Sequence, residues 1–477
     1  MRMPTWGCCY CALMLVAISA AGATNAPAGG AVRERHLALV RERFGDHVRR
    51  YGQDSNWLVR PGLLANRAAR WVQLDAETVG VNDFITRQVE FALITEGSGK
   101  DYEALAVTFA RPSDIHAALE FIGLHAGRPV DYTRHRYWPK GDRVRMTFRW
   151  TEGTNGAVRT VRPEDLILDA RTDQPLPPQG FVFVGSRRVP DPEKPDALVY
   201  AADRYDPMAV ASMYNEMDAV LDVPRRAYKS EVYELQVRND RFPVPRAHWL
   251  CVQLEPFAPD GTPHPTDVTL HIECAPATSP AAMRDLRFTL RDTAGLVRQT
   301  TNDLTGMLAA FERLVGAGRE PYVTLEPDDA LPLKVLRETC AFLASIEQDK
   351  GIRIEPPLPG HPYYRAFLPN PALRDRTTRW VQPLELHLFD RVGGATGQLF
   401  RIEDTWPEGA TGTVYKITPY AVPAPAAAAE YFKAQQYPPL VVIFAPGAMR
   451  YGTLRPFLQA ALDARASLYV FLSEDNQ

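Results

Sequence analysis

The chain has 477 residues, of which 45% are hydrophobic and 23% are charged, and it contains 41 prolines. At about 150 residues per domain, this length predicts two or three domains with real cores, and the prolines predict many loops and edge strands. The formal net charge of −3 lacks the basic excess typical of nucleic-acid binders. We therefore expect no nucleic-acid partner.

Residues 1–23 are typical of a signal peptide: Arg2 supplies the positive end, Cys11 to Ala20 the apolar run, and Ala21 to Ala23 a small-residue cleavage site. The run is too short to span a bilayer comfortably, and no other stretch approaches about 18 consecutive apolar residues. The sequence predicts a periplasmic or secreted protein, cleaved near Ala23 and without a transmembrane segment in the mature chain. An uncleaved N-terminal anchor is the alternative.

Residues 24–60 are predicted to form an amphipathic helical region. Apolar residues recur at helical spacing while arginines cover the remaining surface; the apolar set is Leu37, Val40, Phe44, Val48 and Tyr51. We expect this helix to dock on its own domain. A membrane-surface or partner-binding helix is the alternative.

Residues 101–130 are predicted to form a strand, a turn and a helix. Leu105, Val107 and Phe109 alternate with smaller residues, which is the pattern of a half-buried strand. Ser113 stands where an N-cap is expected, and an apolar stripe follows it at helical spacing: Ile115, Ala118, Leu119 and Ile122.

Several segments resemble the YdjY domain family of bacterial exported proteins, and together they extend from about Asn66 to Pro256. They are the Tyr102–Leu105 opening, the Ile115–Leu119 helix, Asn66–Leu74, Val161–Leu166, Gly180–Ser186 and Val199–Asp203. One departure follows Asp203, where Arg204-Tyr205-Asp206 stands in place of an expected glycine. The family has no established activity. The resemblance thus implies a strand-rich domain, which we place at residues 61–256, without implying a reaction.

A proline-rich stretch from Pro256 to Pro265 is the predicted boundary to a C-terminal domain over residues 266–477. Residues 323–337 align without gaps on residues 441–455, and each copy continues to a second strand, giving repeats at about 323–355 and 441–473. Strand–helix–strand units of this kind predict a small α/β sandwich. The expected fold class is therefore α+β / α/β.

This strand–turn–helix–strand pattern weakly resembles the periplasmic domains of TolR/ExbD-type proteins. Those domains carry one such unit behind a transmembrane helix, whereas this chain has two units and no such helix ahead of them.

Three cysteines survive signal cleavage, and we predict that all three are unpaired. Matching the apolar faces of a hairpin would pair Val252 with Ile272, which leaves Cys251 and Cys274 on opposite faces. Cys340 continues an apolar helical stripe and is predicted to be a small core residue.

Glu103 and His116 are the candidate catalytic residues. Parity places Glu103 on the apolar strand face, and His116 lies in the first turn of the next helix. A Glu–His pair can bind a metal or exchange protons. The alternative is a structural hydrogen bond that joins strand to helix, which we favour because buried polar groups are usually hydrogen-bonded.

An aromatic and basic cluster after the first repeat is the candidate binding site. Its residues are types enriched at binding surfaces, and they are Tyr363, Tyr364, Arg365, Arg376 and Trp380. A groove for an anionic or sugar-containing polymer and a solvated loop are both open. The sequence contains no HExxH, no paired-cysteine metal motif and no dinucleotide fingerprint, so we predict no metal and no cofactor.

The sequence as a whole predicts an exported, non-catalytic binding or assembly protein of the cell envelope. Its partner would be another envelope protein or a polymer. The alternative is a metal-dependent enzyme that uses Glu103 and His116.

Overall fold

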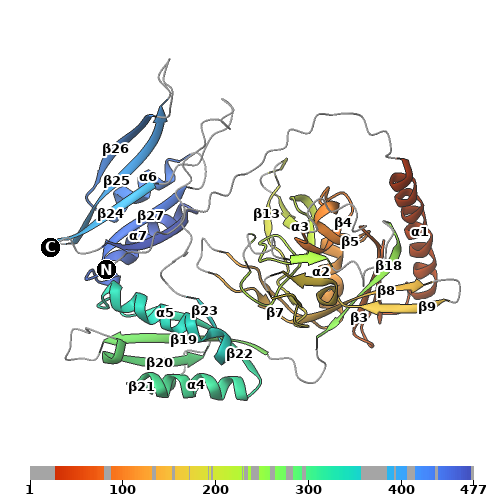
Figure 1. The fold of residues 1–477 in the computed structure, drawn as a ribbon, viewed down its shortest axis with the longest axis horizontal. Helices are drawn as coiled ribbons and strands as arrows, with labels where there is room; N and C mark the ends of the chain where they lie inside the picture. Colours follow the sequence, from red (N-terminus) through yellow and green to blue (C-terminus); the bar gives the residue numbers. More distant parts are fainter. Residues whose placement is uncertain are drawn as a thin grey trace, which may run out of the picture.

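The computed structural model describes residues 27–79, 88–131, 136–152, 156–170, 172–191, 193–194, 197–227, 229, 235–237, 247–257, 264–274, 283–292, 297–355, 384–391, 394–405, 414–435 and 439–473. These residues form a strand-rich N-terminal domain followed by two five-stranded sheets with helices (Figure 1). The predicted combination of a strand-rich domain and an α/β region is confirmed.

The N-terminal domain is built on a closed eight-stranded barrel. In pairing order its strands are β3 (Trp71–Thr78), β18 (Trp249–Pro256), β8 (Arg143–Glu152), β12 (Phe181–Phe183), β16 (Leu221–Asp222), β15 (Ala209–Ser212), β4 (Phe91–Thr95) and β5 (Ala104–Thr108). The barrel closes where β5 pairs with β3, with Thr108 opposite Ala76. The buried side chains of Val144 and Phe148 alternate with outward-facing arginines along β8.

Short elements extend and decorate the barrel. The hairpin of β1 (Trp57–Arg60) and β2 (Leu63–Asn66) continues from β3, and β9 (Ala157–Val161) pairs with β8. The remaining short elements are η2 (Asp101–Glu103), β6 (Ala126–Arg128), β7 (Lys140–Gly141), η4 (Pro163–Leu166), β10 (Ile167–Asp169), β11 (Gln174–Pro175), β13 (Arg188–Pro190), β14 (Leu198–Tyr200), α3 (Ala201–Arg204) and β17 (Leu235–Val237).

The predicted strand–turn–helix segment is present as β5 followed by α2 (Pro112–Phe121), but its cap differs from the prediction. The N-cap position is Arg111, and no side chain of that residue caps the helix. Instead, the backbone N–H of Ser113 donates to Asp203 Oδ1 at 2.8 Å. The cap therefore comes from a residue remote in sequence, which explains why a local pattern placed it wrongly.

The arginine-rich helix α1 (Pro27–Tyr51) docks on the barrel through buried carboxylates, as predicted. Glu77 of β3 accepts from Arg33 Nε at 2.6 Å and lies 2.7 Å from His36 Nδ1, while Arg43 Nε is 3.2 Å from Asp75 Oδ1. Figure 1 shows α1 on the side of the barrel away from the two repeat units. Among the described residues, no helix combines the length and apolar character needed to cross a membrane.

The C-terminal region is a tandem duplication. The first unit contains β19 (His264–Cys274), η6 (Met283–Asp285), β20 (Leu286–Asp292), β21 (Val297–Thr301), α4 (Leu304–Gly316), β22 (Arg319–Pro327), α5 (Leu333–Lys350) and β23 (Arg353–Glu355). The second contains β24 (Leu384–Arg391), β25 (Gly394–Thr405), β26 (Val414–Val422), α6 (Pro425–Lys433), β27 (Leu440–Pro446), α7 (Tyr451–Asp463) and β28 (Ser467–Ser473). The sheet orders β21-β20-β19-β22-β23 and β26-β25-β24-β27-β28 are equivalent. Each predicted repeat copy therefore lies inside a larger unit, which also includes three preceding strands and one helix.

The two units pair through equivalent residues. Pro332 forms an antiparallel bridge with Arg450, which is its partner in the gap-free sequence alignment. Leu333 N donates to Met449 O at 2.8 Å, and the symmetric bond runs from Tyr451 N to Leu331 O at 2.7 Å. The units therefore form an internal pseudo-dimer with one continuous hydrophobic core.

The cysteine prediction is confirmed in its result but not in its reason. Cys251, Cys274 and Cys340 are all free. Cys251 lies on β18, which pairs with β3 and β8, whereas Cys274 lies on β19, which pairs with β20 and β22. The proposed Val252–Ile272 hairpin does not form, because the two strands belong to different sheets.

Candidate functional site

Glu103 lies in η2, immediately before β5, rather than on the apolar face of that strand as predicted. Its Oε2 is 4.0 Å from Lys100 Nζ, and that buried oxygen has no hydrogen-bond partner among the described residues. Desolvation and the neighbouring Glu90 carboxylate raise the pKa of Glu103.

His116 has a different set of partners. Its Nδ1 lies 3.0 Å from the hydroxyl of Tyr200, and its Nε2 lies 3.4 Å from Glu120 Oε1. The ring packs edge-on against Phe183, with 5.0 Å between centroids. Within the described part of the chain, no hydrogen bond or ion pair joins His116 to Glu103. The predicted contact between these two residues is therefore wrong.

The His116 arrangement is suited to bracing the fold. Burial raises the pKa of Tyr200 well above its ordinary value, so its hydroxyl keeps its proton and can donate to His116 Nδ1. This contact ties α2 to β14. Gly185 packs against the same ring with φ +82°, and a Cβ there would lie 2.9 Å from His116 Cε1. A larger residue at this position would displace the imidazole.

A second contact joins two of the segments that resemble the YdjY family. Glu164 of η4 accepts a hydrogen bond from the backbone N–H of Gly180 at 2.9 Å. Gly180 has φ +65°, and a Cβ would lie 2.6 Å from Val144 O. The glycine is therefore required by both backbone conformation and space. Glu164 and Gly180, which belong to segments that resemble the YdjY family, thus stabilise a turn of the barrel domain.

The five residues of the predicted binding cluster lie outside the described residues: Tyr363, Tyr364, Arg365, Arg376 and Trp380. Across the described ranges, no group of three or more His, Cys, Asp or Glu side chains is placed to hold a metal ion.

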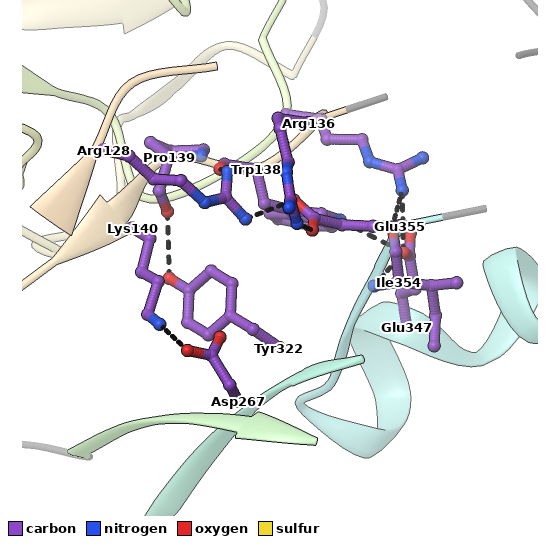
Figure 2. A network of polar contacts seen from close by, with 11 residues as sticks. Arg128, Arg136, Trp138, Pro139, Lys140, Asp267, Tyr322, Glu347, Ile354 and Glu355 are labelled. Atoms are coloured by element: carbon purple, nitrogen blue, oxygen red, sulfur yellow. Dashed lines mark hydrogen bonds and ion pairs between the residues drawn. The ribbon is translucent and has the colours of Figure 1, made fainter. Parts of the chain in front are cut away.

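A network of polar contacts joins the barrel to the first repeat unit (Figure 2). Glu355 of β23 is buried and forms ion pairs with two arginines of the barrel domain. Its Oε1 lies 2.5 Å from Arg128 Nη2, and its Oε2 lies 2.7 Å from Arg136 Nη1. Glu320 of β22 is also buried, and its Oε1 forms ion pairs with Nη2 of Arg143 on β8 at 3.0 Å and with Nη2 of Arg353 at 2.7 Å. Apart from Arg353, which belongs to the repeat unit itself, these guanidinium groups come from the barrel domain and meet carboxylates of the repeat unit. This arrangement is electrostatic complementarity across a docking interface.

Trp138 anchors the centre of this interface. The guanidinium groups of Arg226 and Arg353 lie 4.9 and 4.7 Å from its ring centroid. Its indole N–H donates to Glu347 Oε1 at 3.1 Å, and the same oxygen accepts from Arg226 at 2.8 Å. A buried Trp held by cations and by its own N–H is typical of an energetically dominant contact.

Two further contacts in Figure 2 extend the interface along the first repeat sheet. The Tyr322 hydroxyl donates to the Pro139 carbonyl at 2.9 Å, and Lys140 pairs with Asp267. The sequence did not identify these residues as a site. A partial signal was present on β22, where Glu320 and Tyr322 alternate with Pro321 and Val323, so two polar groups share the sheet face opposite the helices.

Comparison with known families places a YdjY domain at residues 63–229. The match ends before β18, although that strand completes the barrel. No curated protein matches the chain. A solved structure of the foamy viral protease-reverse transcriptase in complex with RNA/DNA hybrid aligns with 9% identity and a TM-score of 0.12, covering 44% of this chain and 36% of that one. The chain spans about a third of that structure's length, and a TM-score this low establishes no common fold.

Proposed function

We propose that this YdjY-domain protein is an exported, non-catalytic binding or assembly protein of the cell envelope. Export is supported by the positive, apolar and small-residue parts of residues 1–23. N-terminal sequencing of protein taken from the cell envelope should begin at Thr24. Intact Met1 on cytoplasmic protein would contradict export.

The interface in Figure 2 is the observation that supports a role in assembly. The first repeat unit binds a folded domain through Glu320, Tyr322 and Glu355, and the chain contains a second unit of the same architecture. In the second unit, the strand registers place Leu440 and Tyr469 at the positions of Tyr322 and Glu355. The duplicated scaffold therefore offers a second protein-docking module with a more apolar surface, and its expected partner is another envelope protein.

The alternative of a metal-dependent enzyme requires Glu103 and His116 to lie together, and the structure does not support this arrangement. Glu103 and His116 have separate partners, and the imidazole contacts Tyr200 and Glu120. A metal site would need both side chains to converge.

Photo-crosslinking in living cells tests the assembly role. Phe389 and Ile417 are 45% and 59% exposed, and both lie on the sheet face of the second unit opposite its helices. A photoreactive residue at either position should give a discrete adduct with another envelope protein. Leu198, which is 60% exposed on the barrel domain, is the control position. Absence of an adduct at both test positions, or equal adducts at Leu198, would contradict the proposal.

A further inference from the structure

A polar groove of about 460 Å³ lies on the outer surface of the barrel, between β8, β9, β18 and η4. Its floor is formed by the outward-facing residues of β8, because the alternate residues Val144, Met146 and Phe148 fill the barrel. The side chains that line the groove include Arg145, Thr147, Arg149, Thr160, Arg162 and Gln253.

The charges in this groove do not cancel. Glu255 accepts from Arg145 Nη2 at 2.9 Å and from Gln253 Nε2 at 2.6 Å. Arg162 and Asp165 form a two-point pair at 2.8 and 2.9 Å.

Arg149, in contrast, hydrogen-bonds to the neutral amide of Gln253. Beyond it, Asp75 is matched by Arg43 of α1. The groove therefore retains one positive charge, located at Arg149.

Two hydroxyl groups flank this cation. Thr160 of β9 stands directly opposite Arg149 in the strand pairing, and Thr147 lies two positions along β8 on the same face. Neither side-chain hydroxyl makes a hydrogen bond within the described residues. Both can therefore donate to, or accept from, a hydroxylated ligand.

We propose that this groove binds an acidic sugar that carries one carboxylate. A guanidinium fork pairs with a planar carboxylate in two-point geometry, and a single uncompensated cation selects a single negative charge. The threonine hydroxyls and the Gln253 amide match the hydroxyl groups of a sugar ring. The volume lies within the range usual for small-ligand sites, roughly 300–1,000 Å³. The groove lies on the barrel, apart from the docking surface proposed for the second repeat unit.

Isothermal titration of the full mature protein with sodium glucuronate tests the proposal, with glucose and inorganic phosphate as comparison probes. Wild-type protein should bind glucuronate saturably and more tightly than either comparison probe. Arg149→Gln should weaken glucuronate binding by about tenfold or more, because it removes the charge-assisted pairing with the carboxylate.

Thr160→Val provides a second test that leaves the charge unchanged, and it should also weaken glucuronate binding. The matched control is Arg159→Gln, since Arg159 lies on the same strand but pairs with Glu152 and does not line the groove. Its affinity should stay within about twofold of wild type.

No saturable binding by the wild type would overturn the proposal. Phosphate binding as tight as glucuronate would overturn the sugar assignment, and equal affinities for Arg149→Gln and Arg159→Gln would overturn the assignment to this groove. Unchanged thermal unfolding of Arg149→Gln would show that a loss of binding is local.

Discussion

Glu164 is buried and incompletely hydrogen-bonded, and these two features determine how its contribution to stability depends on pH. The residue is 6% exposed, Oε1 accepts from the backbone N–H of Gly180, and Oε2 has no hydrogen-bond partner among the described residues. Desolvation raises its pKa above the ordinary 4.5. A carboxyl whose pKa is raised by folding contributes stability below its unfolded-state pKa, and this contribution is lost as the pH rises through the folded-state value.

We therefore expect Glu164→Gln to be more stable than wild type at pH 8, by about 1 kcal/mol, and to lose this advantage at pH 4. The substitution keeps the oxygen that accepts from Gly180 and removes the buried negative charge. Urea unfolding at the two pH values measures the effect. Glu152→Gln is the exposed control, and an equal difference for Glu164→Gln at both pH values would refute the pH linkage.

The hydroxyl of Tyr200 is expected to stabilise the contact between α2 and β14. Tyr200→Phe removes the partner of His116 Nδ1 with little change in shape, so it should lower the free energy of unfolding by about 1 kcal/mol. Tyr205→Phe is a matched control, because its hydroxyl bonds to Pro190 O at an exposed site. Equal urea midpoints for Tyr200→Phe and wild type would contradict the brace.

The sequence identified Glu103 and His116 as notable residues but could not identify their partners. The predicted strand includes Glu103 and so begins one residue too early, because the chain turns through η2 before β5 begins at Ala104. Tyr200 reaches His116 only through the tertiary fold. Since no hydrogen bond or ion pair joins Glu103 to His116 in the described part of the chain, the stability effects of altering each should add.

Helix α1 shows what an amphipathic pattern can and cannot predict. The helix docks as predicted, although Val48 of the predicted stripe is 45% exposed. The stripe did not reveal that Arg33 and His36 would meet the buried Glu77. The arginines that suggested a membrane-surface helix are in part internal ion-pair partners.

Glu77→Ala should consequently loosen α1. It leaves Arg33 and His36 without their shared carboxylate, and because Arg33 is 25% exposed we expect a loss of about 2 kcal/mol rather than the larger cost of a fully buried pair. Hydrogen exchange should accelerate along α1 more than in the barrel strands. Glu42→Ala, at an exposed position of the same helix, is the control, and unchanged exchange in α1 would contradict this account.

The repeat was recognisable in sequence only where both copies share a strand, turn and helix. The preceding strands differ on their outer face: Thr269 and Glu273 of β19 occupy the positions of Glu385 and Phe389 of β24. Their buried faces keep the same apolar character, with Leu270 equivalent to Leu386. The buried positions stay apolar in both units because the helices pack on them. The residues of the outer face differ between the units because each unit contacts different surroundings there.

The proline-rich stretch predicted a boundary between two domains, and the interface between the barrel and the first repeat unit predicts that these two parts move as one body. Glu320 and Glu355 are buried against three arginines of the barrel domain, and such pairs are screened by salt much less than exposed ones. Removing one partner of a buried pair leaves an uncompensated charge, which is strongly unfavourable. The covalent connection should therefore be dispensable for holding the barrel on the first repeat unit.

Replacing residues 258–263 with a specific protease site tests whether the covalent connection is needed to hold the barrel on the first repeat unit. After cleavage, the N-terminal and C-terminal fragments should still elute together from a size-exclusion column at physiological salt. The double variant Glu320→Lys/Glu355→Lys should separate into two fragments, because it places like charges opposite Arg128, Arg136 and Arg143. Glu326→Lys, an exposed change on the same strand as Glu320, should leave the cleaved protein together. Separation of the cleaved wild type would show that the interface alone does not hold the modules, and co-elution of the double variant would show that the glutamates are not what joins them.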